Sequence, residues 1–463
     1  MKAFNYVLIF IFGGISSIVI FFILKQIHGD RNEFISFMPD SKYLQVRDDF
    51  SVYAPYVYDP GEAKHNHNRF RGKNSESSDQ EALSSLRVAV EMREMGKHDK
   101  ALKLFQHALA LAPKHPDILV KFGEFLEHNE DDIVKADYMY FQALTINPHN
   151  SIALAHRQRT AHRVEAIDEH RLQILDNKRD ALSAFHESNS ALRRAKKEAY
   201  FQHIYHSVGI EGNTMTLAQT RSVLETRMAV EGKTVDEHNE IFGLDAAMKY
   251  INATLVNKND YITVRDILEI HRRVLGHVDP IEGGEFRRTQ VYVGGHTPPR
   301  PNDVAILMRR FEQWLNSKGA LSMHPVRYAA LAHYKLVHIH PFTDGNGRTS
   351  RLLMNTILMR AGYPPVTIPK QQRNKYYEHL QVANEGDIRP FIRFIADCTE
   401  KTLDMYLWAT SELISQVPLL PQNDELKNQT IDLVEELDAS LNDDTINDGS
   451  SDTVSMQIRL DET

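Results

Sequence analysis

The chain has 463 residues, of which 42% are hydrophobic and 25% are charged, and its formal net charge is −8. These proportions exclude a wholly disordered chain and a protein with many membrane spans, and the charge disfavours nucleic-acid binding. The single cysteine, Cys398, excludes an intrachain disulfide and a cysteine-based metal cluster. Residues 417–463 contain 12 acidic and 2 basic residues, so the negative charge of the chain is concentrated in this C-terminal segment.

Residues 4–24 contain no charged side chain and predict a transmembrane anchor. As a helix this stretch is about 31 Å long, which is enough to cross the hydrocarbon core of a bilayer. A cleaved signal peptide is the alternative, but its apolar stretch is normally shorter and ends in a small-residue cleavage site, whereas Lys25 follows here. The few flanking charges do not set the orientation.

Residues 25–80 are polar and irregular, and we expect them to form a linker. They contain three prolines and a run of alternating histidine and asparagine from His65 to Asn68. A metal site in this run is the alternative, but a solvated linker is the simpler interpretation.

Residues 81–150 contain an internal repeat of helical pattern. Three residues recur 35 positions later: Ala101, Ala108 and Pro113 as Ala136, Ala143 and Pro148. Small residues allow paired helices to approach closely, and the proline ends the second helix of each pair. The pattern resembles two tetratricopeptide (TPR) repeats, which form either a plain helical stack or a concave surface for a partner.

The rest of the chain also reads as mainly helical. Residues 151–199 are rich in charge and poor in Pro and Gly, which predicts a long, exposed linker helix. Residues 200–410 form the largest unit and are long enough to bury a core. Within it, the β-branched alternation of residues 288–293, closed by Gly294 and Gly295, predicts a short β-hairpin. Residues 411–463 are expected to be an acidic, disordered tail.

The chemistry is concentrated in residues 340–351, HPFTDGNGRTSR. Pro341 ends one helix at His340, and the next helix begins near Arg348. The glycines between them leave backbone N–H groups free, which form an anion pocket together with the positive end of the helix. Arg348 and Arg351 lie on one face of that helix and suit a polyphosphate, while Asp344 offers one carboxylate to Mg²⁺. His340 suits a general base, because the ordinary pKa of histidine is about 6.5. Together these residues predict nucleotidyl or phosphoryl transfer.

A metal triad of His333, His338 and His340 is an alternative for the same region. Their offsets of five and seven positions do not match the helical spacing of zinc sites, and no second carboxylate accompanies them. We therefore disfavour a zinc centre here.

The segment matches the pattern of Fic-domain proteins, HPFx(D/E)GNGRxxR, at every fixed position, and the chain resembles this family. The resemblance implies an all-helical Fic domain and a protein adenylyltransferase, which transfers AMP from ATP to a target hydroxyl. His340 would be the general base, Asp344 would hold Mg²⁺ (with Mn²⁺ as an alternative ion), and Arg351 would bind the γ-phosphate. The predicted hairpin resembles the Fic flap, which binds the target segment as an added strand. The implied nucleotide-binding residues are Val293, Gly294, Gly295, His296, Asp344, Gly345, Asn346, Gly347, Arg348, Thr349, Ser350, Arg351, Tyr376, Tyr377 and Asn384.

Residues 207–213, SVGIEGN, match the inhibitory pattern of this family, (S/T)xxxE(G/N). From the residues alone, a helix end capped by Gly212 is the simpler interpretation. The resemblance implies that Glu211 pairs with Arg351, which withholds Arg351 from the γ-phosphate and misaligns ATP. Glu211 would also orient a water for the hydrolytic removal of AMP from a modified target.

The order of anchor, repeats, linker helix and catalytic core resembles the animal Fic proteins of the endoplasmic-reticulum (ER) membrane. That resemblance implies cytosolic residues 1–3, a type II span, a lumenal catalytic domain and a homodimer formed through the Fic domain. It also implies the ER chaperone BiP as the target, in the unfolded protein response. The sequons at Asn252 and Asn428 could be used only in the lumen. Two alternatives remain: a membrane-tethered repeat adaptor with a silent Fic core, and a Fic transferase that uses another donor.

Overall fold

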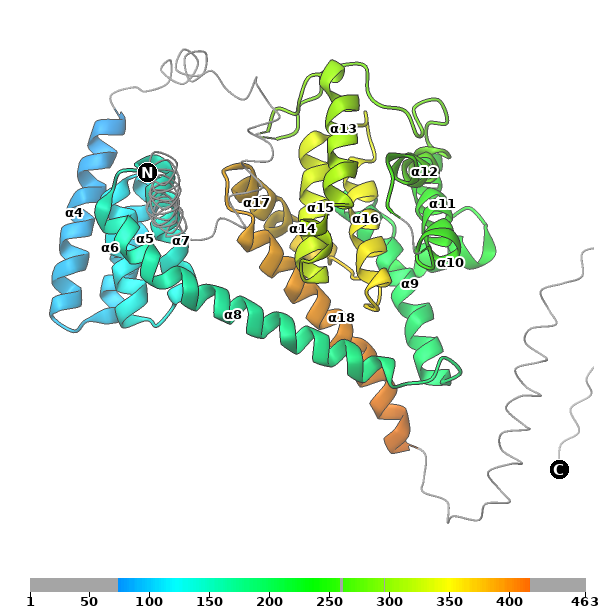
Figure 1. Ribbon diagram of the computed structural model, residues 1–463, viewed down its shortest axis with the longest axis horizontal. Helices are drawn as coiled ribbons and strands as arrows, with labels where there is room; N and C mark the ends of the chain where they lie inside the picture. Colours follow the sequence, from blue (N-terminus) through cyan, green and yellow to red (C-terminus); the bar gives the residue numbers. More distant parts are fainter. Residues whose placement is uncertain (1–73, 259–260, 295, 417–463) are drawn as a thin grey trace, which may run out of the picture. The chain divides into compact units, whose positions relative to one another are not determined.

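The computed structural model describes residues 74–258, 261–294 and 296–416. All regular structure in these ranges is helical, which confirms the mainly α fold class (Figure 1). The predicted span of residues 4–24, residues 25–73 of the predicted linker and residues 417–463 of the predicted tail lie outside the described residues. Residues 74–80 of the linker belong to a helix (Asn74–Glu94), and residues 411–416 of the tail continue another (Arg389–Gln416). No helix within the described ranges is both long enough and apolar enough to cross a membrane.

Two helix pairs occupy the region of the predicted repeats. The first pair is α4 (Asn74–Glu94) with α5 (His98–Leu111), and the second is α6 (Pro116–Asn129) with α7 (Ile133–Ile146). The four alanines of the repeat pattern are fully buried in α5 and α7. Gly123 of α6 shows how closely the helices approach, because a Cβ there would lie 2.5 Å from the Tyr140 ring. Small residues are therefore required where these helices meet.

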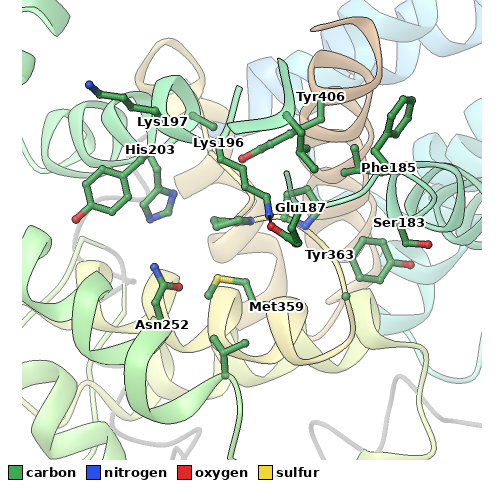
Figure 2. Close-up of a pocket in the computed structure, with 18 of the residues that line it drawn as sticks. Ser183, Phe185, Glu187, Lys196, Lys197, His203, Asn252, Met359, Tyr363 and Tyr406 are labelled. Atoms are coloured by element: carbon green, nitrogen blue, oxygen red, sulfur yellow. Dashed lines mark hydrogen bonds and ion pairs between the residues drawn. The ribbon is translucent and has the colours of Figure 1, made fainter. Parts of the chain in front are cut away.

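The predicted linker helix is not continuous. Residues 151–199 form α8 (Ser151–Ser183) and the first half of α9 (Ser190–Ile210). Asn189 causes the break, because its side chain accepts hydrogen bonds from the N–H groups of Ala191 and Leu192, at 2.9 and 3.0 Å, and so starts a new helix. The α8–α9 turn forms one wall of a cavity of about 890 Å³ (Figure 2).

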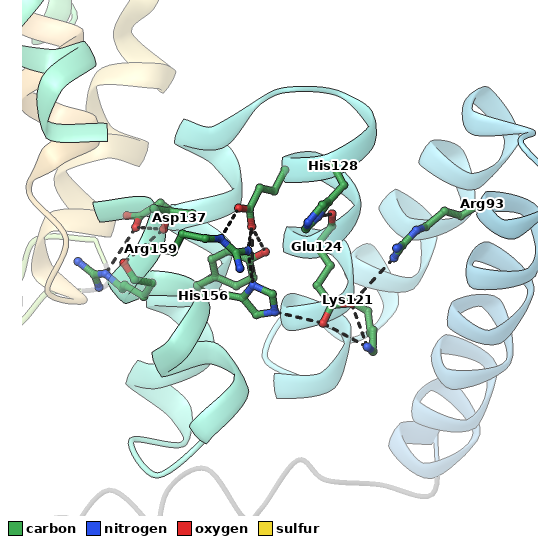
Figure 3. A network of polar contacts seen from close by, with 11 residues as sticks. Arg93, Lys121, Glu124, His128, Asp137, His156 and Arg159 are labelled. Carbon is green, nitrogen blue, oxygen red and sulfur yellow. Dashed lines mark hydrogen bonds and ion pairs between the residues drawn. The ribbon is translucent and has the colours of Figure 1, made fainter. Parts of the chain in front are cut away.

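Polar contacts fix α8 against the repeat helices (Figure 3). Arg159 of α8 donates two hydrogen bonds to Glu127 of α6, at 2.8 and 3.0 Å. The ring of His156 stacks on Tyr140 with the centroids 4.8 Å apart, and its Nε2 lies 3.4 Å from Glu124. The second helix pair and α8 therefore share one polar and aromatic interface.

A buried ionic cluster joins α7 to the start of α18 (Arg389–Gln416). Arg389 donates to Asp387 through Nε and Nη2, at 2.8 and 2.7 Å, and to Asp137 of α7 through Nη1, at 2.5 Å. Thr160 of α8 donates to the other oxygen of Asp137 at 2.7 Å. All four side chains are buried, so water screens these charges poorly and the partners must compensate one another.

The C-terminal core is built on α15 (Pro325–Ile339) and α16 (Asn346–Arg360), and their connection is the predicted catalytic loop. Both helices are buried along most of their length, which fixes the two ends of the loop. The surrounding elements, besides α9 and α18, are α10 (Leu217–Thr226), α11 (Val235–Tyr250), a π-helix (Ile251–Leu255), α12 (Val264–Leu275), α13 (Pro301–Leu315), α14 (Lys318–Leu321), a 3₁₀-helix (Lys370–Gln372) and α17 (Arg373–Asn384).

The prediction of a regular β-hairpin at residues 288–293 is wrong. The described part of this segment has a single antiparallel bridge, between Val293 and His296. Pro298 and Pro299 carry no N–H group, so they cannot extend a strand ladder. Side chains satisfy the backbone instead, as where Gln290 donates to Pro298 O at 2.9 Å. We refer to residues 287–300 as the flap segment.

Candidate active site

His340 ends α15 in the left-handed conformation, with φ 51° and ψ 60°. This conformation is uncommon for a residue other than glycine, and Pro341 disfavours the right-handed helical alternative. The His340 N–H still donates to Leu336 O at 3.0 Å and closes the last helical turn. The chain therefore turns sharply out of α15 at the residue that the sequence predicts as the base.

The protonation state of His340 follows from its contacts. Its Nδ1 lies 3.2 Å from the carbonyl oxygen of Val337, so Nδ1 carries the proton and Nε2 keeps its lone pair. Burial lowers the pKa of His340 to about 4, below the ordinary value expected from the sequence. At neutral pH the ring is uncharged, and its Nε2 is able to accept a proton.

Two side chains hold the loop between α15 and α16 in place. Asn346 accepts a hydrogen bond from the Phe342 N–H at 3.0 Å and donates one to Phe342 O at 2.9 Å. His271 of α12 accepts from the Gly284 N–H at 2.9 Å, so its other nitrogen donates to Asp344 O, 3.0 Å away. The His271 ring also stacks on Phe342 with the centroids 3.6 Å apart. The loop is therefore preorganised, and the Asn346 side chain supports the loop itself.

Arg287 is a residue of this site that the sequence analysis missed. It is 2% exposed, and its Nε donates to His340 O at 2.7 Å. Its Nη1 donates to Thr289 O at 3.1 Å, its Nη2 to Pro299 O, and its N–H to Pro341 O at 2.9 Å. One guanidinium thus joins the flap segment to the peptide of the predicted base. No local motif marks Arg287, because its partner lies 53 positions away.

Arg348 lies in the first turn of α16, where it is 2% exposed. Its Nη2 donates to the Asp344 carboxylate at 2.7 Å, and its Nη1 lies 3.4 Å from Glu240 of α11. The Asp344 side chain is 67% exposed, so it faces solvent beyond this contact. Glu240 was not predicted, and burial raises its pKa. Two carboxylates therefore share the charge of Arg348.

Arg351 is bound to α9. Its Nε donates to Ser207 Oγ at 3.0 Å, and its Nη2 donates to Ser207 O at 2.9 Å and to Glu211 Oε1 at 2.7 Å. The side chain is 2% exposed, and its Nη1 has no hydrogen-bond partner among the described residues. A buried N–H group without an acceptor is costly, so this nitrogen marks a place where an anionic acceptor would be stabilised.

Glu211 lies directly against the first turn of α16. A Cβ at Gly347 would be 2.4 Å from Glu211 Oε1 and 3.1 Å from Arg351 Nη1, so only glycine permits this approach. The other carboxylate oxygen, Oε2, accepts a hydrogen bond from Tyr377 at 3.4 Å. The amino end of a helix attracts anions, and in this structure a carboxylate occupies that position.

Three further residues of the loop and of α16 have structural contacts. Gly345 has φ 74°, and a Cβ there would meet the His271 ring at 3.2 Å. Thr349 and Ser350 are fully buried, and Ser350 donates to Asn346 O at 2.8 Å. Glycine is therefore required at position 345 for its φ and for its lack of a Cβ. The Thr349 N–H donates to Gly345 O at 2.9 Å, so Thr349 and Ser350 belong to the buried framework of α16.

The remaining predicted nucleotide contacts are spread around the pocket. Val293 and His296 form the bridge of the flap segment, Gly294 between them has φ 53°, and Gly295 lies outside the described residues. His296 Nε2 lies 3.0 Å from His338 O, which ties the flap segment to α15.

The predicted contacts on α17 differ in exposure. Tyr377 is 39% exposed beside Glu211, whereas Tyr376 is buried and its hydroxyl lies 3.0 Å from His333 Nε2. Asn384 Oδ1 lies 3.0 Å from His338 Nδ1. Tyr376 therefore supports the site from the core, and Tyr377 is the tyrosine that solvent reaches.

Comparison with known proteins decides the family. The pattern of the Fic/DOC family matches residues 261–358. The protein adenylyltransferase Fic of Aedes aegypti is 66% identical over 432 residues, covering 91% of this chain and 87% of that protein. The chain belongs to the Fic/DOC family. The protein adenylyltransferase Fic of Drosophila melanogaster is 63% identical over 439 residues, with the same coverage of both chains. The solved structure of residues 134–508 of Fic-1 from Caenorhabditis elegans is 44% identical, with a TM-score of 0.67, and covers 72% of this chain and 98% of that one.

In this Fic protein the site is assembled from two consecutive helices, α15 and α16, and from α9, which is distant from them in sequence. His340, the predicted base, ends α15, the predicted anion-binding turn begins α16, and Glu211 ends α9, 140 positions before Arg351. The side chains that hold these parts together, Arg287, His271, Ser207 and Glu240, lie outside the catalytic loop.

Proposed function

We propose that this Fic protein transfers AMP from ATP to a Ser or Thr hydroxyl of a target protein. The observation that carries the proposal is a geometric one. His340, with Nδ1 3.2 Å from Val337 O, lies at one end of a loop whose other end presents two buried arginines at a helix N-terminus. The relatives at 63–66% identity are named protein adenylyltransferases, which supports the same reaction.

The chemistry assigns a role to each side chain. His340 Nε2 accepts the proton of the target hydroxyl as its oxygen attacks the α-phosphorus, and pyrophosphate leaves. The N–H groups of the first turn of α16 and the guanidinium of Arg348 bind the α- and β-phosphates, and Arg351 binds the γ-phosphate. Arg287 keeps the His340 peptide in place and acts as a positioning residue.

Asp344 fits a magnesium ligand. It is a single exposed carboxylate at the lip of the phosphate pocket, and Mg²⁺ commonly binds one protein carboxylate together with phosphates and waters. A bound Mg²⁺, or Mn²⁺ in its place, supplies charge neutralisation of the phosphates. Arg348 orients the carboxylate by donating to Oδ2 at 2.7 Å, and the side chain stays 67% exposed.

Glu211 inhibits the transfer in this proposal. Its carboxylate holds Arg351 Nη2 at 2.7 Å and lies against Gly347, so it occupies the position a γ-phosphate requires. The carboxylate would repel a γ-phosphate that approaches Arg351, because both groups are negatively charged. ATP then binds without its α-phosphorus in line for attack.

The same carboxylate supports a reverse activity. With AMP attached to a target hydroxyl, no γ-phosphate competes with Glu211. Its Oε2, which accepts only the long hydrogen bond from Tyr377 at 3.4 Å, then also accepts one from a water and orients that water toward the phosphorus. Hydrolytic removal of AMP, de-AMPylation, then requires Glu211, whereas AMPylation is limited by it.

The cellular setting is proposed from the resemblance together with two structural observations. Asn252 of the sequon Asn252-Ala253-Thr254 is exposed, and Cys398 is buried with a pKa raised by burial to about 12, which suits an oxidising lumen. We place the catalytic domain in the ER lumen behind a single type II span, with BiP as target, TPR repeats that contact it and a homodimer through the Fic domain. The electrophoretic mobility of the protein before and after glycosidase treatment tests this topology, and a shift is expected. The control replaces the predicted span by a cleaved signal peptide, which directs the domain into the lumen. If the control shifts and the native protein does not, the lumenal topology is contradicted.

The test of the reaction uses ATP labelled either in the α- or in the γ-phosphate. The Glu211→Gly variant is expected to incorporate the α-label and not the γ-label into itself and into BiP. Incorporation of the γ-label would make the enzyme a kinase, and incorporation of neither label would support the silent-core alternative.

A further inference from the structure

The cavity beside the α8–α9 turn is separate from the phosphate pocket. Its volume of about 890 Å³ is that of a site for a small organic ligand. The end of α8, the turn, α9, the π-helix, the end of α16 and α18 all contribute to its walls (Figure 2). Most of the lining is apolar or aromatic, including Leu182, Phe185, Met248, Val256, Met359 and Tyr406.

Two lysines of α9, Lys196 and Lys197, line this cavity, and their side chains are 46% and 69% exposed. Lys197 pairs with Glu225, 3.3 Å away. Lys196 reaches Glu187 of the turn at 2.6 Å, a contact visible near the centre of Figure 2. Glu187 is 81% exposed, so moving it into water costs little. An anionic group of a ligand could therefore replace Glu187 as the partner of Lys196.

The cavity also contains one buried polar group, His203 of α9. The ring is 3% exposed, and neither nitrogen makes a hydrogen bond to a described side chain. Burial lowers its pKa to about 4, and the interaction with the backbone of Val366 offsets this only in part. A neutral imidazole adds one polar contact to an otherwise apolar wall.

Two helices connect the cavity to the inhibitory contact. His203, Ser207 and Glu211 follow one another at intervals of four residues, so they lie along one face of α9. Met359 of the cavity and Arg351 are eight residues apart on α16, a distance of about 12 Å along the helix. A ligand between these two helices therefore contacts the elements that carry Glu211 and Arg351.

From this geometry we propose that the cavity binds an anionic amphiphile, with an apolar body in the cavity and a carboxylate head on Lys196, and that the bound molecule stabilises the Glu211–Arg351 contact. The cavity exists in the conformation in which that contact is formed, and a ligand favours the conformation to which it binds. Occupancy therefore lowers AMP transfer. This second part rests on the autoinhibition proposed above.

Photo-crosslinking of the full-length protein in membranes tests the binding part. The probe is palmitate with a diazirine in its acyl chain, and adducts are located by peptide mass spectrometry. We expect adducts on peptides that line the cavity, displaced by unlabelled palmitate. Lys196→Glu is expected to lower their yield about tenfold, and Met359→Trp to lower it by filling the cavity. Glu187→Gln is expected to raise it several-fold, because it removes the competing carboxylate.

The matched control is Lys103→Glu, an exposed lysine of α5, which should leave the yield unchanged. Absence of cavity adducts, or yields that are insensitive to both Lys196→Glu and Glu187→Gln, would overturn the binding site.

Self-labelling from α-labelled ATP tests the regulatory part. Palmitate is expected to lower labelling of the wild-type protein several-fold and to leave the Glu211→Gly variant unchanged. Equal inhibition of both proteins, or inhibition of neither, would overturn the proposal that the ligand acts through the Glu211–Arg351 contact. The binding site itself is still tested by the cross-linked adducts. Absence of labelling in Glu211→Gly without palmitate would instead contradict the proposed transfer itself.

Discussion

Glu211 Oε1 lies 2.7 Å from Arg351 Nη2, and only the absence of a Cβ at Gly347 lets that oxygen approach the first turn of α16. Ser207 accepts hydrogen bonds from the same guanidinium through its hydroxyl and its carbonyl oxygen, the latter from the nitrogen that Glu211 also binds. His340, the loop and the two arginines are assembled around this contact. The structure therefore describes a site in which a carboxylate is bound at the N-terminus of α16.

Replacing Glu211 by glycine should raise the rate of AMP transfer about 100-fold, because Arg351 is released and ATP can align for attack. The measurement is the initial rate of labelling from α-labelled ATP. The matched control is Glu231→Gly, an exposed glutamate in the loop before α11, which should change nothing. An equal rate in the wild-type and Glu211→Gly proteins would remove the Glu211–Arg351 contact as the inhibitory element.

Replacing His340 by alanine in the Glu211→Gly protein should lower the rate at least about 100-fold, the usual contribution of a general base. Tight nucleotide binding should persist, because His340 does not contact the predicted phosphate positions. Labelling that persists at the Glu211→Gly rate would exclude His340 as the base.

The pH dependence of the Glu211→Gly protein should reflect the lowered pKa of His340. The imidazole is the base only when neutral, and burial lowers its pKa to about 4. The value of kcat/KM, which reports the free enzyme, should therefore stay nearly constant from pH 8 down to about pH 5.5 and fall only at lower pH. A midpoint near the ordinary histidine pKa of about 6.5 would contradict the buried, neutral imidazole.

Replacing Arg287 by glutamine in the Glu211→Gly background should lower kcat about 100-fold and leave the KM for ATP nearly unchanged. The reason is that Arg287 holds the peptide of His340 and does not face the phosphate pocket. Arg287→Lys should recover part of kcat, since an ammonium can still reach one of the carbonyl oxygens. The control is Arg288→Gln, at the adjacent, exposed arginine. If Arg287→Gln raises the KM for ATP without lowering kcat, Arg287 belongs to nucleotide binding instead.

Replacing Arg389 by methionine should destabilise the protein by about 3 kcal/mol, because buried Asp387 would lose its hydrogen-bonded cation and buried Asp137 would keep only the longer ion pair with Arg157, at 3.7 Å. Burial raises the pKa of Asp387, but Arg389 more than offsets this and lowers it below its ordinary value. The cluster therefore stabilises the fold fully above about pH 4 and loses this contribution as pH falls through the lower, folded pKa. Thermal unfolding measures the effect, with exposed Arg163→Met as the control. An unchanged melting temperature would show that the cluster contributes no net stability.

The catalytic loop could be predicted from sequence because its chemistry is local. Within twelve residues, a proline ends one helix and glycines open the next, so His340 and Arg348 necessarily flank one turn. The flap was predicted less well, because the alternation of residues 288–293 resembles a strand while the prolines at 298 and 299 prevent a regular partner strand. The break between α8 and α9 had a local signal, Asn189 as a helix cap, which the run of charged residues obscured.

The supporting residues could not be predicted for a different reason. Arg287, His271 and Glu240 act through tertiary contacts with residues that are 53, 73 and 108 positions away, and their own neighbours in sequence form no motif. Glu211 was found only because its segment matches a family pattern. Its position against Gly347 depends on how α9 packs on α16, which no local pattern encodes.

The proposed reaction is tested most directly by the intact mass of purified BiP after incubation with ATP and Mg²⁺, with the wild-type and Glu211→Gly proteins side by side. We expect a mass gain of one AMP with Glu211→Gly, little gain with the wild-type protein, and none when His340→Ala is added. The wild-type protein should also restore the original mass of the modified chaperone. A gain of one phosphate, or a gain that persists without His340, would contradict nucleotidyl transfer by this loop.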